Sequence, residues 1–219
     1  MRHRPTRTGY TGTMDPMRPI RDPRLEVSIR NLERALRPYG GPHDDPEPEP
    51  GVVQAAVSLI LREVPGPGVL VVKRAVLSSD PWSGHMALPG GRRDPEDPSL
   101  LETAVRETRE ETAVVLDPDR SHRGRLDPVA PRSTELPAIA ITPFVFSAPD
   151  PVHARVNSQE IAGVYWVPIA HLLDPAARAS HELRLNGALM RFPAFEVEGE
   201  KIWGLTYRIL SNLLDPLAR

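Results

Sequence analysis

Three glutamates lie close together in a segment with helical character. Glu107 and Glu111 are four residues apart and Glu110 is three residues from Glu107, so a helix would place them along one edge. Like charges at this spacing destabilise a helix by roughly a few tenths of a kcal/mol per pair, and a divalent cation would offset that repulsion. Two bridged ions could also clamp a diphosphate and activate water. The alternative is that these glutamates form a solvated charged face of the helix. The helical segment considered without its neighbours in the sequence favours that alternative.

The type of metal follows from the available ligands. The chain contains no Cys, so a metal must be held by oxygen or imidazole. Carboxylates favour hard ions, which makes Mg²⁺ or Mn²⁺ the expected cofactor. Gly90 and Gly91 precede the glutamates in the chain. Glycine lets the backbone approach a ligand closely, so a carbonyl of Gly90 or Gly91 could complete the metal shell.

The composition argues against several classes of protein. The 219 residues suit one domain with a tail, and the formal net charge of −2 gives no bias toward nucleic acid. No apolar run approaches the length of a membrane span, and the basic, Pro-rich N-terminus lacks the apolar segment of a secretory signal. We therefore expect a cytoplasmic protein that acts on a small molecule, with no nucleic-acid or membrane partner.

The chain is predicted to have two parts. Residues 1–50 read as a tail, a helix and a Pro-rich linker, and residues 51–219 as the folded domain. The helix follows Asp22-Pro23, and its apolar face is formed by Leu25, Ile29, Leu32 and Leu36. That helix could brace the domain or form a homodimer contact, and the sequence leaves both open.

The elements of the domain are predicted from periodicity and turn residues. Strands are expected over residues 55–63, 69–74, 137–146, 161–167, 181–185 and 188–195, with a further strand beginning at Val114. Helices are expected from Ser99 to Ala113 and over residues 202–214. Because strands and helices interleave while hairpins dominate, the expected class is mixed α/β (α+β) rather than a doubly wound parallel sheet.

The spacing of the candidate residues resembles the signature of the Nudix hydrolases. That signature runs Gly, five residues, Glu, seven residues, then Arg-Glu-aliphatic-x-Glu-Glu-x-Gly-aliphatic. This chain matches it at Gly91, Arg106, Glu107, Glu110, Glu111 and Val114. The connecting loop is one residue longer, Asp97 stands about where the first Glu belongs, and Thr108 and Ala113 replace an aliphatic residue and a Gly.

The resemblance implies the Nudix fold, an α/β/α sandwich with a mixed central sheet. It also implies that Glu107, Glu110 and Glu111 bind the metal, with the carbonyl of Gly90 or Gly91 as a further ligand. Arg106 would hold the loop and orient a carboxylate, and Asp97 is its expected partner because a guanidinium gives bidentate, permanently charged support.

Glu160 is a further catalytic candidate. It precedes the predicted strand 161–167 and is similar in position to a carboxylate that Nudix enzymes use as a general base or extra metal ligand. An ordinary surface glutamate at a strand start is the alternative.

The sequence upstream of the signature is similar to the coenzyme A diphosphatase subgroup. Residues 70–75 (Leu-Val-Val-Lys-Arg-Ala) match the first half of an additional motif of that subgroup, and Gly84 with residues 85–91 matches the second half. The span between Arg74 and Gly84 is one residue longer and lacks the second Arg of the subgroup. Lys73 and Arg74 are candidate phosphate contacts, or members of an exposed strand face.

Two side chains near this motif have alternative interpretations. Trp82 could stack on an adenine or anchor its own loop. His85 could touch the diphosphate, carry a proton, or make a structural hydrogen bond.

The resemblance predicts metal-dependent hydrolysis of a nucleoside diphosphate derivative, with coenzyme A or a derivative as the favoured substrate and two phosphate monoesters as products. The alternatives are a Nudix hydrolase of ADP-ribose, NADH or another nucleotide, and a Nudix-fold module that binds a nucleotide without turnover.

Overall fold

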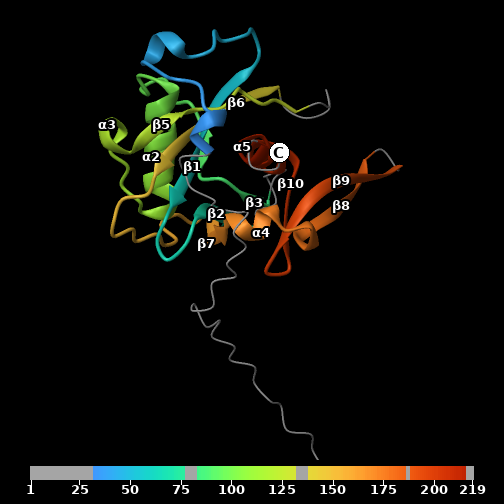
Figure 1. Ribbon diagram of the computed structural model, residues 1–219. Helices are drawn as coiled ribbons and strands as arrows, with labels where there is room; N and C mark the ends of the chain where they lie inside the picture. The colour runs from blue at the N-terminus through green and yellow to red at the C-terminus, as the bar shows by residue number, and fades with distance from the viewer. Residues whose placement is uncertain (1–31, 77–82, 132–137, 186–187, 216–219) are drawn as a thin grey trace, which may run out of the picture.

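The computed structural model describes residues 32–76, 83–131, 138–185 and 188–215 (Figure 1). Within these ranges the larger sheet contains β1 (Val53–Arg62), β2 (Gly68–Arg74), β3 (Met86–Ala87), β4 (Gly90–Arg92), β5 (His122–Arg125), β6 (Ile139–Ser147) and β7 (Ile161–Pro168). The smaller sheet contains β8 (Arg178–Leu185), β9 (Ala188–Val197) and β10 (Glu200–Trp203). The helices are α2 (Leu100–Thr112), α3 (Pro118–Ser121), α4 (Ile169–Leu173) and α5 (Gly204–Leu214), with 3₁₀ turns η1 (Glu33–Ala35), η2 (Pro42–Asp44) and η3 (Pro175–Ala177).

Strand β1 is central to the larger sheet. Residues 53–61 run parallel to residues 139–147 of β6. The other edge of β1 is shared, because β4 pairs with its first half and β2 with its end, both antiparallel. The sheet is therefore mixed, as expected. The shared edge also places the glycines of β4 directly beside β1.

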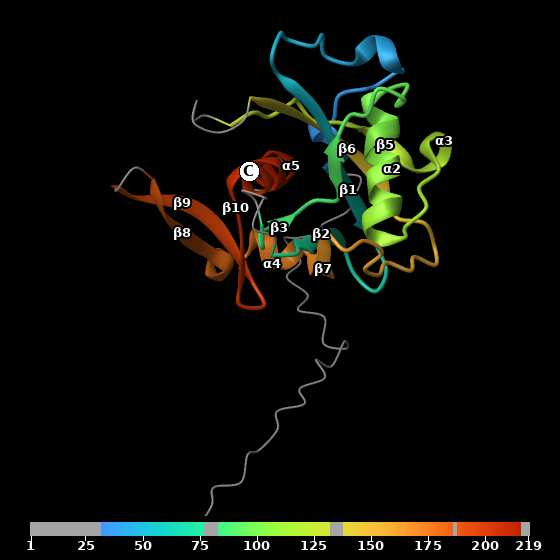
Figure 2. The same ribbon diagram turned by 180° about the vertical axis from the view of Figure 1, so that it is seen from behind.

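The two faces of β1 support two separate cores. Successive side chains of a strand point to opposite faces. Leu59 and Leu61 accordingly belong to one buried cluster, and Ile60 belongs to the other. Helix α2 covers the face of Ile60 through Leu100 and Ala104, and α5 covers the opposite face. Figures 1 and 2 show α2 and α5 on opposite sides of the sheet, which confirms the predicted α/β/α sandwich.

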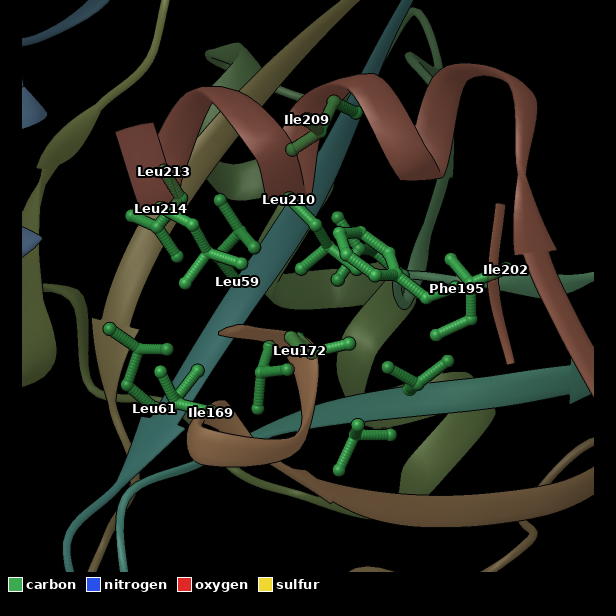
Figure 3. Close-up of a cluster of buried hydrophobic side chains, with 14 of the residues drawn as sticks. Leu59, Leu61, Ile169, Leu172, Phe195, Ile202, Ile209, Leu210, Leu213 and Leu214 are labelled. Carbon is green, nitrogen blue, oxygen red and sulfur yellow. The ribbon is translucent and has the colours of Figure 1, made fainter. Parts of the chain in front are cut away.

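Helix α5 closes the second core. Figure 3 shows its Ile209, Leu210, Leu213 and Leu214 directed toward Leu59 of β1 and Leu172 of α4. Each fully buried side chain of this size contributes about 1.5–3 kcal/mol by leaving water. The C-terminal helix therefore holds the sheet from the side opposite α2.

The C-terminal region differs from prediction in one boundary. The hairpin over residues 181–195 is confirmed, with β8 and β9 paired from residue 178 to residue 195. The helix begins at Gly204 rather than at residue 202, because a tight turn at Glu198-Gly199, both with positive φ, folds the chain back onto β9 as β10. Among the helices that the structure describes, none is long and apolar enough to cross a membrane.

Helix α2 begins and ends as predicted, but no strand follows it. The hydroxyl of Ser99 accepts from the N–H of Glu102 at 3.2 Å, and Ala113 ends the helix with a φ of 59°. The predicted strand at Val114 is wrong. Instead, the last carbonyls of α2 accept hydrogen bonds from the chain after β6: Arg155 N–H donates to Thr112 at 2.9 Å, and Asn157 N–H to Glu111 at 3.0 Å.

Two short elements that the sequence did not predict follow α2. Residues 118–121 form α3 and residues 122–125 form β5, which pairs with β6. The sequence did not reveal these elements because each is only four residues long, and short elements give little periodicity.

The N-terminal segment packs on the domain from residue 32 onward. Leu32 is fully buried in the α5 cluster, and Arg37 forms a β-bridge with Arg125 of β5. Residues 25–31 of the predicted helix lie outside the described residues, and η1 is a 3₁₀ turn within its remainder. Residues 41–50, predicted as a linker, run along the domain surface with hydrogen bonds to it. The division of the chain at residue 51 stays a prediction.

Candidate active site

Two glycines bring the backbone of β4 against the glutamates of α2. The N–H of Gly90 donates to Oε2 of Glu111 at 3.0 Å. A Cβ at Gly90, whose φ is +149°, would overlap the carbonyl oxygen of Ala56, and a Cβ at Gly91 would overlap the carboxylate of Glu107. Only a residue without a side chain fits at either position without a shift of its neighbours. The loop is therefore in direct contact with the acidic cluster.

Arg106 fixes the opposite side of the cluster. Its Nε and Nη2 donate to the two carboxylate oxygens of Asp97 at 3.0 and 2.9 Å, which confirms the expected bidentate pair. Its Nη1 donates to Glu107 at 3.0 Å and to Glu110 at 3.3 Å. A further bond to the carbonyl of Arg92, at 3.2 Å, ties the same guanidinium to β4. One side chain thus connects the loop to two of the three glutamates.

Asp97 is a buried anchor for the loop. Besides Arg106, it accepts from the hydroxyl of Thr103 at 2.9 Å and from the N–H of Asp94 at 3.0 Å. The hydrogen bonds from Arg106 are the largest cause that lowers its pKa, to about 2, and burial only partly opposes them. Asp97 is therefore a carboxylate that the fold holds ionised, and it is the partner that the sequence predicts for Arg106.

Burial raises the pKa of two of the glutamates. Desolvation raises the pKa of Glu111 to about 8, although the N–H of Gly90 acts in the other direction. The pKa of Glu107 is also raised by burial, against the effect of Arg106. The charge of Glu107 also raises the pKa of Glu111. A cation at this position would stabilise the ionised forms of both side chains.

Arg74 and Glu160 lie within electrostatic range of the same carboxylate. The charge of Arg74 lowers the pKa of Glu111, and the charge of Glu160 raises it. The backbone explains their proximity: β2 pairs with β7, and the N–H of Ala75 donates to the carbonyl of Glu160 at 2.7 Å. Residues from α2, β2 and the start of β7 therefore meet at Glu111. The catalytic role of Glu160 and the substrate role of Arg74 stay predictions.

The remaining substrate candidates lie elsewhere. Lys73 forms an ion pair with Glu200 of β10. The charge of its neighbour Arg74 instead lowers the pKa of Glu111. The ring of His85 lies edge-on to Trp203 of β10, with the ring centroids 4.8 Å apart. The N–H of Gly84 donates to the carbonyl of Ala75 at 3.3 Å, and Trp82 lies outside the described residues. The structure thus brings Lys73 and His85 to the smaller sheet.

The donor set fits a hard divalent cation, but the side chains are not arranged around one point. Within the described ranges, no three Asp, Glu or His side chains converge closely enough to hold an ion as they stand. The reason is visible in the hydrogen bonds, because Arg106 holds Glu107 and Glu110 while Gly90 holds Glu111. The fit lies in the chemistry of the donors, because carboxylate and carbonyl oxygens are the ligands that hard cations prefer.

Two features of the site had no signal in the sequence. The hydroxyl of Thr108 donates to the hydroxyl of Ser58 on β1 at 2.8 Å, and that hydroxyl donates to the carbonyl of Ala104 at 3.1 Å. This pairing explains why a polar residue is tolerated where an aliphatic one was expected. Asn157 also donates to the carbonyl of Arg109 at 3.0 Å, at the end of α2. Both partners are about fifty residues away along the chain, beyond the reach of local patterns.

Comparison with known families and sequences gives consistent matches. A family model described as the NUDIX domain matches residues 52–185. An uncharacterized protein of Schizosaccharomyces pombe is 36% identical over 59% of this chain, and the match covers 40% of that protein. An uncharacterized Nudix hydrolase of Yersinia enterocolitica is 31% identical over 76% of this chain and 85% of its own. The human mitochondrial coenzyme A diphosphatase is 34% identical over 75% of this chain and 69% of its own.

The comparison with solved structures also gives matches. A MutT/nudix family protein from Enterococcus faecalis superposes with a TM-score of 0.47 and 18% identity, over 72% of this chain and 52% of that one. The NUDIX domain of an NrtR protein from Shewanella oneidensis, solved with ADP ribose, has a TM-score of 0.44 and 25% identity, over 59% and 80% of the two chains.

Proposed function

Because this chain belongs to the NUDIX domain family, we propose that it hydrolyses the diphosphate linkage of coenzyme A or one of its derivatives. The family membership makes it a hydrolase of anhydrides in phosphorus-containing compounds. From coenzyme A the products are an adenosine bisphosphate and phosphopantetheine, each with a terminal phosphate monoester.

The arrangement of α2 against β4 carries this proposal. Glu111 is 5% exposed and accepts from Gly90, Glu107 lies against Gly91, and Arg106 contacts both Glu107 and Glu110. Burying carboxylates in this way costs free energy unless a charged partner is bound. The carboxylates of a solvated charged face would stay in water. The burial of Glu111 therefore favours a cation-binding site over a solvated charged face.

We propose Mg²⁺ or Mn²⁺ as the cofactor, held by Glu107, Glu110, Glu111 and a carbonyl of Gly90 or Gly91. When bound, such ions lower the pKa of water and neutralise charge on phosphoryl oxygens. The small-molecule diphosphate is the expected partner, and its phosphoryl groups must lie close to this cluster.

The side chains of the protein position the reactants. Arg106 and Asp97 hold the loop, so that Gly90 and Gly91 keep their place beside the glutamates. Arg74 is near enough to Glu111 to bind a phosphoryl oxygen of the substrate. Glu160, whose charge also acts on Glu111, is the proposed general base, and its carboxylate would accept a proton from the attacking water.

The choice of coenzyme A depends on sequence similarity in two places. Residues 70–75 and 84–91 resemble the motif of the coenzyme A diphosphatases, and one relative bears that name. Another diphosphate, such as ADP-ribose or NADH, is the second candidate, because the motif lacks one Arg and Lys73 is paired with Glu200.

A substrate panel tests the proposal. The purified full chain, in Mg²⁺ and then in Mn²⁺, is incubated with coenzyme A, oxidised coenzyme A, acyl-coenzyme A, ADP-ribose, NADH and nucleoside triphosphates. Glu110→Gln and Glu111→Gln should each lower kcat by at least about a hundredfold, since each removes a charge from the metal site. Glu102→Gln is the matched control, because Glu102 lies on the same helix near its first turn.

Three outcomes are distinguishable. Preferred cleavage of coenzyme A compounds, lost in the two site variants and kept in the control, supports the whole proposal. Preferred cleavage of another diphosphate retains the site and changes the substrate. Tight binding of a nucleotide with no turnover in either metal would instead identify a binding module.

A further inference from the structure

We propose that Asp45, which lies upstream of the segment that matches the family, positions the first turn of α2 and the loop leading into it. Through them it positions the carboxylates of the candidate metal site. The link to catalysis rests on the proposed function, whereas the positioning of the helix does not. The matched segment begins at residue 52, so Asp45 belongs to a part of the chain outside the family domain.

Asp45 caps the catalytic helix from a distance. Its Oδ2 accepts from the N–H of Leu100, the first residue of α2, at 3.0 Å. The first N–H groups of a helix have no partner within it, and a negative charge there also interacts favourably with the helix dipole. The hydroxyl of the adjacent Ser99 accepts from the N–H of Glu102. Helix α2 therefore has a local cap and a second, charged cap supplied by a residue 55 positions earlier.

The same carboxylate also holds the loop before α2, through Arg93. Nη1 of Arg93 lies 3.5 Å from Oδ2 of Asp45. The guanidinium donates in addition to the carbonyl of Pro98 at 3.1 Å and to the carbonyl of Asp97 at 3.3 Å. Asp97 is thus held twice: its carboxylate by Arg106 and its carbonyl by Arg93. Asp45 provides the negative charge beside Arg93, whose Nη1 also donates to Oε1 of Gln54 at 3.3 Å.

Asp45 is itself fixed against the sheet. Its side chain is 7% exposed, and its Oδ1 accepts from the hydroxyl of Tyr39 at 2.8 Å. The ring of Tyr39 packs edge-on against Phe144 of β6, with the centroids 5.0 Å apart. One residue on, the carbonyl of Pro46 accepts from Nε2 of Gln54 on β1 at 2.7 Å. The cap is therefore rigidly attached to the two central strands.

The consequence for the metal site follows from the tight contact at Gly91. The carboxylate of Glu107 already fills the space next to that glycine, so a shift of the loop or of α2 changes the distance between the proposed ligands. Loss of Asp45 would leave the N–H of Leu100 without this partner and the charge of Arg93 uncompensated. A hydrogen bond to a charged group contributes about 1.5–3 kcal/mol, which corresponds to roughly a tenfold or larger effect.

The test uses the full chain with Asp45→Ala, Asp45→Asn and a matched control, Asp44→Ala. The carboxylate of Asp44 accepts from Gly40 within its own segment. Two readouts are independent of turnover: hydrogen–deuterium exchange over residues 92–104, and Mn²⁺ binding measured by calorimetry without substrate. Steady-state hydrolysis of the substrate identified by the panel is the third readout.

We expect Asp45→Ala to speed exchange over residues 92–104 by about tenfold or more and to weaken Mn²⁺ binding by about tenfold. It should lower kcat while leaving KM nearly unchanged. Asp45→Asn should fall between wild type and Asp45→Ala, because its single amide oxygen can replace the acceptor of Leu100 or that of Tyr39 but not both, and it lacks the charge for Arg93. Asp44→Ala should behave as wild type.

Equal exchange and equal Mn²⁺ affinity in Asp45→Ala and wild type would overturn the proposal, as would an equal effect of Asp44→Ala. Arg93→Gln keeps the cap on Leu100 and removes the ion pair with Asp45 together with the bonds from Arg93 to Asp97 and Pro98, so it decides the question if Asp45→Ala does not fold. Arg93→Gln should reproduce part of the loss of exchange protection and of Mn²⁺ affinity. In the double variant with Asp45→Asn, the combined effect should be smaller than the sum of the two single effects. If wild type neither binds Mn²⁺ nor hydrolyses any diphosphate, the proposed function fails, and exchange still decides the positioning.

Discussion

A side chain at position 91 would occupy the space of the Glu107 carboxylate. We predict that Gly91→Ala lowers kcat and the affinity for Mn²⁺ by about tenfold or more, because the carboxylate must move away from the backbone of β4. The melting temperature should fall only slightly, since the displaced group is the end of a flexible side chain. Activity assays and calorimetry measure the first effect, and thermal unfolding measures the second.

Gly66→Ala is the matched control, because a Cβ there meets nothing within 4 Å. An unchanged Mn²⁺ affinity in Gly91→Ala would show that Glu107 is not a ligand, whatever the effect on stability.

The Arg106–Asp97 pair makes stability depend on acid pH. The pKa of Asp97 is lowered from 3.8 to about 2 in the folded protein, mainly by hydrogen bonds from Arg106. The pair therefore contributes its full stabilisation above pH ~4, and loses it as pH falls through about 2. A difference of nearly two pKa units corresponds to about 2 kcal/mol.

Urea unfolding of wild type and Asp97→Asn from pH 7 to pH 2 checks this expectation. The variant should be less stable by about 2 kcal/mol at pH 7, and the gap should narrow toward pH 2. If the difference in free energy of unfolding between wild type and variant stays constant from pH 7 to pH 2, the destabilisation comes from the lost acceptors for Thr103 and Asp94 rather than from the lost charge.

Ala113 adopts a backbone conformation that favours glycine. Its φ is 59°, in the left-handed region, where a Cβ costs about 1 kcal/mol. Ala113→Gly should therefore stabilise the protein by up to about 1 kcal/mol, offset in part by the larger entropy of glycine in the unfolded chain. Ala113→Val should destabilise it by more than that amount. Thermal and urea unfolding of the two variants test the opposite signs.

Single-residue chemistry was the most predictable part of the site. The spacing of the glutamates placed them on one helix edge, and the guanidinium of Arg106 meets Asp97 as its chemistry requires. Lys73 and Arg74 were harder to assign, since adjacent residues of a strand face opposite ways and only the fold shows which one faces Glu111. His85 likewise meets Trp203, a residue of a distant strand.

The interface between α2 and β1 depends on a buried hydroxyl pair. Ser58→Ala should cost about 1–2 kcal/mol, because it leaves the hydroxyl of Thr108 without its acceptor. Thr108→Val should restore much of this loss in the double variant, since both polar groups are then replaced by apolar ones. A double-mutant cycle followed by urea unfolding measures the coupling, and strictly additive effects would show that the two hydroxyls do not act together.

Element boundaries were predictable where a cap or a turn marked them. Ser99 begins α2 as its side chain indicates, and β8 and β9 pair as the predicted hairpin requires, from residue 178 to residue 195. The sequence does not show that β1 divides one edge between β2 and β4, because that sharing is a property of the assembled sheet. The sequence did not predict β10 for the same reason, because that strand is defined by its pairing with β9 in the assembled sheet.

At the scale of the whole molecule, the family match covers the middle of the chain, and both flanks complete it. Residues 32–50 reach the first turn of α2 through Asp45, and α5 covers the opposite face of the sheet. Family similarity located the catalytic segment and was silent about these flanks. Contacts of the flanks with α2 and β1 join residues that are widely separated in sequence, and these have no local signature.

Helix α5 supplies the last apolar wall of the core that contains Leu59 and Leu61, and Leu32 lies in that same cluster. During synthesis Leu32 and β1 leave the ribosome well before α5. Until residues 204–214 have left the exit tunnel, this face of the central sheet is exposed to solvent, which makes it a surface for chaperones.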